Sequence, residues 1–190
     1  AKNHFDNLNF TVIEIDKTSK NLLSNLYPNQ EIHLKGFEEY KDKKGFDAVI
    51  GNPPYGQKRI FDTNNPDISM LSVHNYFSAR AIKELKDDGI MVNQQGSPFY
   101  TEDAHAMQRS HKKIASTFQI SRVYQAHIPT FAAGYWLFGF ASKKYHPVDD
   151  LDSKAWNSLN LRTRYYTTRL HKGAFYLPAF LEEMLQEVED

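Results

Sequence analysis

The 190-residue sequence contains no cysteine and has no net charge. The absence of cysteine excludes disulfides, thiolate metal ligands and every mechanism that needs a cysteine nucleophile. The 23 lysine and arginine residues balance 23 aspartate and glutamate residues, so the overall charge gives no general attraction to nucleic acid. Any contact with a polyanion would therefore have to be local.

Long apolar runs and early glycines are also missing. No run approaches the ~18 apolar residues that a membrane span needs, and no signal peptide opens the chain, so we expect a cytoplasmic protein without membrane contact. The eight histidines are scattered, and none forms a helical pair at metal spacing, so we expect no metal site. The first glycine is Gly36, so no glycine-rich loop precedes the first predicted strand.

Strand and helix patterns alternate along most of the chain. The predicted strands cover 9–16, 31–37, 46–51, 90–93, 120–124 and 135–141. The predicted helices cover 18–27, 72–88, 102–118 and 177–188. This alternation predicts an α/β fold with an open, mostly parallel sheet and helices on both faces. We expect a main domain over residues 1–145 and a C-terminal extension over 146–190, with a basic segment and an amphipathic helix.

A short proline-containing turn follows the strand predicted at 46–51. In an α/β sheet this is the edge at which ligands bind, and the turn consists of Asn52, Pro53, Pro54 and Tyr55. The two prolines fix φ and remove two backbone donors, which leaves the carbonyls free to accept hydrogen bonds. Two acceptors beside an aromatic face predict a pocket for an exocyclic amine. The alternative is a rigid turn with a surface tyrosine.

This turn resembles the Asn-Pro-Pro-Tyr motif of amino-methyltransferases, and residues 10–144 resemble the adenine-specific DNA methylases. The resemblance implies a Rossmann-like, S-adenosylmethionine-dependent methyltransferase fold whose last strand is antiparallel. It implies methyl transfer from S-adenosylmethionine to the N6 amine of a flipped-out adenine in DNA, in restriction-modification or in mobile elements. Asn52 and Pro53 match the residues that accept the amine protons, Tyr55 matches the residue that stacks on the base, and Pro54 is expected to contact it.

The resemblance also implies how the cofactor is held. Glu14, with Asp16 as the next candidate, matches the acid that binds the ribose hydroxyls, although Asp16 could instead be an acid at the start of the following helix. Phe37 is expected to stack on the cofactor adenine or to be a core residue. Gly36 stands where the family often has an acid before this phenylalanine, which puts the polar contact in question.

Three further residues are candidates for contact with DNA. Phe131, in the loop between the last two strands, is expected either to contact the target base or to belong to the core. Lys58 and Arg59 begin a long loop beside the motif and could meet phosphates or form a solvated charge pair. The basic stretch 162–172 allows either phosphate contact or an ordinary exposed strand or turn.

The first strand and the glycine loop of this fold do not precede residue 9. We expect a gap in the middle of the sheet, to be filled by a missing N-terminal part of the same protein or by another chain, and we expect the 190-residue chain alone to be inactive. Two other functions stay open. One is a methyltransferase that acts on RNA or on a protein glutamine, and the other is a non-catalytic nucleic-acid-binding fragment.

Overall fold

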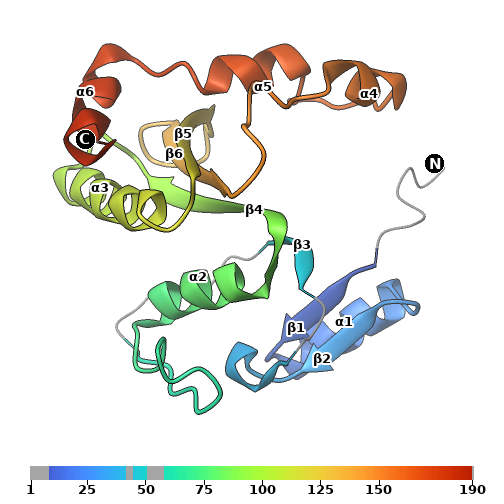
Figure 1. Ribbon diagram of the computed structural model, residues 1–190. Coiled ribbons are helices and arrows are strands. Elements are labelled where there is room, and N and C mark those ends of the chain that lie inside the picture. Colours follow the sequence, from blue (N-terminus) through green and yellow to red (C-terminus); the bar gives the residue numbers. More distant parts are fainter. Residues whose placement is uncertain (1–8, 42–44, 51–57, 190) are drawn as a thin grey trace. The chain divides into compact units, whose positions relative to one another are not determined.

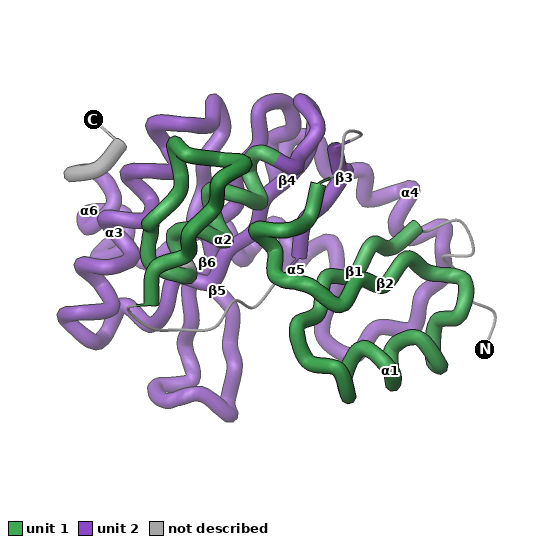
Figure 2. The backbone as a smooth tube through the Cα atoms, turned by 90° about the horizontal axis from the view of Figure 1, so that it is seen from below, with its two compact units in different colours: residues 1–44, 52–83 green, residues 45–51, 84–190 purple. Residues whose placement is uncertain are grey.

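The computed structural model describes residues 9–41, 45–50 and 58–189. The chain divides into two compact units, coloured separately in Figure 2. Unit 1 comprises residues 1–44 and 52–83, and unit 2 comprises residues 45–51 and 84–190. The domain boundary expected at residue 145 stays a prediction.

Unit 1 contains a two-stranded parallel sheet with one crossover helix beside it (Figure 1). Its elements are β1 (Thr11–Glu14), α1 (Lys17–Leu26), β2 (Glu31–Leu34), the 3-10 turn η1 (Phe37–Glu39) and α2 (Val73–Glu84), whose last residue lies in unit 2. The register runs from Thr11 opposite Glu31 to Glu14 opposite Leu34. The carboxyl ends of both strands therefore lie at one edge of this sheet.

Asp16 starts α1. Its Oδ1 accepts a hydrogen bond from the backbone N–H of Ser19 at 2.7 Å, which satisfies one of the free donors in the first helical turn. The helix was expected over 18–27, and it begins one residue earlier, at Lys17. Asp16 thus has the alternative role expected of it, an acid at the start of this helix.

Unit 2 contains a four-stranded sheet with the order β3-β4-β6-β5. Its elements are β3 (Phe46–Val49), β4 (Leu85–Gly96), α3 (Thr101–Ala115), β5 (Ile120–His127), β6 (Tyr135–Ser142), α4 (Ser153–Ser158), α5 (Thr168–Ala174) and α6 (Ala179–Glu189). β3 and β4 are parallel, and β6 runs antiparallel to both β4 and β5. Three of the four strands therefore run in the same direction.

The core of unit 2 lies between the sheet and two helices, α3 and α6, that pack on each other (Figure 1). Its buried residues are Met107, Val123, Leu137, Leu181 and Leu185. Met107 of α3 and the two leucines of α6 therefore lie on the inward faces of their helices.

The mostly parallel α/β architecture is confirmed. Within the described residues β1 and β2 form one ladder and β3, β4, β6 and β5 form another, and the expected gap between them stays a prediction. Whether a glycine loop completes the fold is not tested by the described residues. In the same part of the chain, no helix is both long and apolar enough to cross a membrane.

Candidate functional site

The carboxyl end of β1 holds the first candidate acid, Glu14. This half-buried residue lies opposite Leu34 of β2, and its Oε1 accepts a hydrogen bond from the backbone N–H of Asp16 at 2.8 Å. That bond holds the carboxylate beside the end of the strand. Within the described part of the chain Oε2 has no hydrogen-bond partner, so it can accept from a hydroxyl of a ligand.

Asp16 lies nearby but already has a structural role. Its side chain is exposed, and hydrogen bonds from Ser19 hold the pKa of this carboxyl below its ordinary value. As the N-cap of α1 it uses Oδ1 to accept from the helix. The geometry therefore favours Glu14 over Asp16 as the ribose-binding acid, although both assignments stay predictions.

The carboxyl end of β2 continues into η1, which carries Phe37. The ring is half-buried and packs on Phe77 of α2, with 5.4 Å between the ring centroids. The guanidinium of Arg80 lies 5.4 Å from the centre of the same ring, close enough for a cation–π interaction. Phe37 is thus fixed by α2 at the same sheet edge as Glu14.

Glu38 is an acid that the sequence interpretation missed. A methyl group on Gly36 would lie 2.4 Å from Oε1 of Glu38, so the carboxylate folds back over the bare backbone of the glycine. An acid was expected directly before Phe37, where the chain has Gly36. The structure brings the carboxylate of Glu38, the residue after Phe37, to that place. The order Gly-Phe-Glu in the sequence could have indicated this acid.

The loop 58–72 closes on itself and is anchored to α2. Its neck is held by the backbone bond from Val73 to Lys58 and by an antiparallel bridge between Arg59 and Ser72. Inside, the hydroxyl of Tyr76 donates to Oδ2 of Asp62 at 2.6 Å, and both side chains are fully buried. Burial and the bond to Asp62 raise the pKa of Tyr76, so the phenol remains a donor.

The Asp62 carboxylate accepts several further hydrogen bonds from the loop. Oδ1 accepts from the backbone N–H groups of Asn64 and Asn65, and Oδ2 accepts from the amide of Asn65 at 2.9 Å. Burial opposes the charged form, but these bonds and the one from Tyr76 hold the pKa of Asp62 below its ordinary value. The ionised carboxylate is therefore part of the folded loop.

Replacing Tyr76 with phenylalanine should reduce the free energy of unfolding by about 1.5–3 kcal/mol at pH 7, because a buried carboxylate loses a donor. A carboxyl whose pKa is lowered by folding stabilises the protein above its unfolded pKa, and this contribution is lost as the pH falls through the folded value. The cost of Tyr76→Phe should therefore shrink between pH 7 and pH 3. Urea unfolding at both pH values measures it.

Tyr27→Phe is the matched control, since Tyr27 is 53% exposed in the same unit. It should change stability by less than about 0.5 kcal/mol at either pH. A cost for Tyr76→Phe that is equally small, or that is the same at pH 3 as at pH 7, would contradict the role given to the Asp62 carboxylate.

The other residues expected to contact the substrate are not seen together in one site within the described part of the chain. The motif residues Asn52, Pro53, Pro54 and Tyr55 lie outside them. Lys58 is exposed, and the Arg59 guanidinium donates to the backbone oxygen of Met70 at 2.8 Å, so it is used within its own loop. The roles proposed for these residues stay predictions.

Phe131 belongs to unit 2 and is 42% exposed, so it is not a core residue. It lies in the tight turn between β5 and β6, where Ala133 and Gly134 both have positive φ. Its ring meets Trp136 edge-to-face at 4.9 Å. An exposed aromatic on a defined turn can contact a ligand, but nothing in the geometry identifies one.

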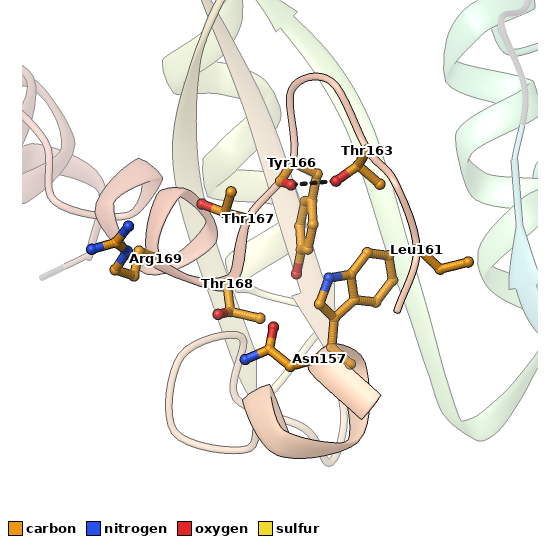
Figure 3. A pocket seen from close by; sticks show the side chains of 8 residues that line it. Asn157, Leu161, Thr163, Tyr166, Thr167, Thr168 and Arg169 are labelled. Carbon is orange, nitrogen blue, oxygen red and sulfur yellow. Dashed lines mark hydrogen bonds between the residues drawn. The ribbon is translucent and has the colours of Figure 1, made fainter. Parts of the chain in front are cut away.

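A cavity of about 380 Å³ lies in the C-terminal segment of unit 2 (Figure 3). It is lined by Trp156, Asn157, Leu161, Thr163, Tyr166, Thr167, Thr168 and Arg169. Five of the lining residues belong to the basic stretch 162–172, but none of the residues expected to bind the cofactor or the amine lines the cavity, so we base the candidate site on the strand ends. No cluster of three metal-ligating side chains occurs in the described ranges.

Comparison with known proteins identifies the family. The family model described as "Eco57I restriction-modification methylase" matches residues 2–131, more than half of the chain. The chain belongs to this methylase family. The expected membership of a methylase family, inferred from the motif at Asn52, is thereby confirmed.

Curated relatives carry a different name. A polyamine aminopropyltransferase from Clostridium beijerinckii is 54% identical over 192 aligned positions, which cover 94% of this chain and 64% of that protein. Another, from Agathobacter rectalis, is 61% identical over 113 residues, 60% of this chain and 40% of that protein. The chain thus spans less than two thirds of the length of either relative.

Two solved structures that resemble the chain are spermidine synthases, and they support the fold. The spermidine synthase of Thermotoga maritima aligns with a TM-score of 0.67 and 24% identity, covering 94% of this chain and 59% of that one. A spermidine synthase in complex with the transition-state analogue AdoDATO aligns with a TM-score of 0.68 and 25% identity, covering 94% and 60%. The α/β architecture of this chain is therefore that of these enzymes.

These relatives overturn the chemistry inferred from the resemblance. Methylation of adenine N6 in DNA, the class of adenine-specific DNA methyltransferase and a place in restriction-modification are wrong, because proteins 54–61% identical to this chain are named for aminopropyl transfer. S-adenosylmethionine as methyl donor and DNA as partner are wrong for the same reason. Identity at this level describes a closer likeness than a family model, which pools divergent sequences.

The physical reason for the error lies in what the turn can specify. Asn52 and the Pro53 carbonyl offer two acceptors for the protons of an amine, and this reasoning from the residues reached only an amine-binding turn. The adenine ring, the methyl group and the DNA came from the resemblance. An alkyl amine presents the same N–H donors as adenine N6. The tetrapeptide therefore does not show which of these two amines is the substrate.

Proposed function

We propose that this chain is part of an aminopropyltransferase that moves a 3-aminopropyl group from decarboxylated S-adenosylmethionine to a primary amine of a diamine. The carrying observation is the 54% identity over 94% of the chain to the aminopropyltransferase of Clostridium beijerinckii. The likeness in fold to two spermidine synthases supports it.

The proposed reaction is a direct displacement. The amine nitrogen attacks the carbon of the aminopropyl group that is bound to the sulfonium sulfur. A C–N bond forms, and the bond between that carbon and sulfur breaks. The sulfur keeps the electron pair and leaves as the neutral thioether of methylthioadenosine, while the amine loses a proton to solvent. The protein needs only to align the amine with this carbon. Such positioning can lower the activation barrier by about 7–11 kcal/mol.

The donor keeps the adenosine part of S-adenosylmethionine, so the cofactor-binding residues keep their proposed roles. Glu14 would accept from the ribose hydroxyls through Oε2, as acids at strand ends do in related folds. Phe37, held by Phe77 and Arg80, would contact the adenine ring at the same edge of unit 1. Glu38, folded over Gly36, is a second carboxylate at that edge and adds an acceptor for the adenine or ribose.

The motif residues keep their relation to an amine but not to a base. Asn52 and Pro53 would accept the protons of the attacking amine, and Tyr55 with Pro54 would form an apolar wall for the alkyl chain. The phosphate and base contacts expected of Lys58, Arg59 and Phe131 lose their ligand once DNA is not the partner.

A product assay tests this function. The intact protein, given decarboxylated S-adenosylmethionine and 1,4-diaminobutane, should release methylthioadenosine and spermidine in equal amounts. With S-adenosylmethionine and adenine-containing DNA it should transfer no methyl group. Methyl transfer to DNA without any aminopropyl transfer would overturn the proposal, and chromatography of both products decides between the two.

A further inference from the structure

The C-terminal segment of unit 2 carries positive charge that no acid balances. Residues 153–181 contain five lysine and arginine residues and no aspartate or glutamate, although the whole chain has no net charge. The five are Lys154, Arg162, Arg164, Arg169 and Lys172. All of them are exposed, and none makes an ion pair with another described residue. A surface with charge of one sign attracts ligands of the opposite sign, so this segment favours an anion.

The cavity of about 380 Å³ lies within this segment, and two aromatic rings line it (Figure 3). Trp156 meets Tyr166 edge-to-face, with 4.6 Å between the ring centroids. His171 fixes the phenol. Its Nε2 lies 2.8 Å from the Pro147 carbonyl, which can only accept, so Nε2 carries the proton and Nδ1 accepts from the Tyr166 hydroxyl at 3.0 Å. A cavity of this size with fixed aromatic side chains is typical of sites for small molecules.

Four polar groups that line the cavity have no hydrogen-bond partner among the described residues. They are the indole N–H of Trp156, the amide of Asn157, the hydroxyl of Thr168 and the guanidinium of Arg169. All four can donate, and the indole and the guanidinium cannot accept. None of the described residues that line the cavity is an acid. The lining therefore suits a ligand that is rich in hydrogen-bond acceptors and negatively charged.

We propose that this cavity binds a small organic phosphate that carries a planar ring, the class to which nucleoside monophosphates belong. The ring would pack on Trp156, since aromatic side chains stack on planar rings. Arg169 is exposed, so its guanidinium is free to turn toward the phosphate and bind two of its oxygens. Figure 3 shows Asn157 and Thr168 on one side of the cavity, where they would donate to the same phosphate.

The site lies in unit 2 alone and uses none of the residues proposed to bind the donor or the amine. It can therefore exist whatever reaction the protein catalyses. Calorimetric titration of the intact protein with adenosine monophosphate and with inorganic phosphate tests it. The nucleotide should bind about tenfold more tightly than inorganic phosphate, the gain expected from one ring stacked on an aromatic side chain.

Arg169→Gln should weaken binding of adenosine monophosphate about tenfold, the loss expected for one hydrogen bond between charged groups. Lys172→Gln is the matched control. It removes the same charge from an exposed residue of the same helix, α5, that does not line the cavity, so the dissociation constant should change less than about twofold. The unfolding midpoints of both variants without ligand should equal that of the wild type.

Trp156→Leu and Trp156→Phe test the ring contact. Leucine removes the aromatic face and should weaken binding of the nucleotide about tenfold, without weakening binding of inorganic phosphate. Phenylalanine keeps a ring and should restore most of the affinity. If both variants bind the nucleotide as tightly as the wild type, the ring does not pack on Trp156 and the site as proposed is overturned.

Three other results would also overturn the site. The first is that the wild type binds adenosine monophosphate no more tightly than inorganic phosphate, or not at all. The second is equal weakening by Arg169→Gln and Lys172→Gln, which would mean that only the charge of the segment attracts the nucleotide. The third is a loss of binding in Glu14→Gln that Arg169→Gln does not cause, because the nucleotide would then occupy the place proposed for the adenosine of the donor.

Discussion

Replacing Glu14 with glutamine should lower kcat/KM for decarboxylated S-adenosylmethionine roughly 10- to 150-fold, which corresponds to the about 1.5–3 kcal/mol of a hydrogen bond to a charged group. Glutamine keeps an oxygen that can accept from the backbone N–H of Asp16, so the local fold should survive. What is lost is the negative charge and one acceptor for the ribose hydroxyls. Steady-state kinetics with varied donor measures the effect, and the unfolding midpoint should stay unchanged.

Asp16→Asn tests whether donor binding depends on a contact from Glu14 or only on negative charge near the end of β1. Asparagine is as good an N-cap as aspartate, so α1 should keep its cap to Ser19. The substitution removes one negative charge two residues from Glu14 without touching the proposed ribose contact. An equal loss of kcat/KM in both variants would mean that local charge, and not a contact from Glu14, supports donor binding.

The order of strands and helices could be predicted because hydrophobic periodicity is a local property. The strand at β1 and the helices α1, α3 and α6 lie where apolar spacing places them, within a few residues. The ends of elements that depend on strand pairing were harder to predict from the sequence. The helix expected to reach residue 88 ends at Glu84, because Leu85 already pairs with Phe46 of β3.

The candidate site could be predicted in part. Glu14 and Phe37 follow two strands of a parallel sheet, and parallel strands end at one edge, so their shared location follows from topology. Contacts that depend on tertiary packing could not be predicted. Tyr76 reaches Asp62 only because the loop 58–72 folds onto α2, and Gln95 and Asn93 meet only over a glycine from another strand.

The transferred group is the part that the sequence could not decide. A sulfonium donor with an adenosine end is held in the same way whether it gives a methyl or an aminopropyl group. The acceptor amine is likewise recognised by its N–H donors, and Asn52 with Pro53 offers acceptors to any amine. Discrimination must come from groups that contact the rest of the acceptor molecule.

The turn at 52–55, which we propose binds the amine, should matter most in the chemical step. An alkyl amine becomes a nucleophile only when its lone pair is free, and positive charge develops on nitrogen as it attacks the carbon beside sulfur. Acceptors placed in advance at Asn52 and Pro53 would stabilise that charge and orient the lone pair. Loss of one pre-positioned polar group at a site of developing charge costs about 10²- to 10³-fold in kcat.

Asn52→Ala should therefore lower kcat by about 10²- to 10³-fold and leave the dissociation constant of the donor within roughly twofold. Asn64→Ala is the control, because Asn64 is an exposed asparagine whose amide makes only a long 3.4 Å bond to the Glu38 carbonyl. Surface substitutions of that kind change free energies by about 0.5 kcal/mol or less. Single-turnover rates with bound donor isolate the chemical step. A kcat for Asn52→Ala within a few-fold of the wild type would remove the turn from the reaction, since an acceptor that stabilises the attacking amine cannot be dispensable while chemistry limits the rate.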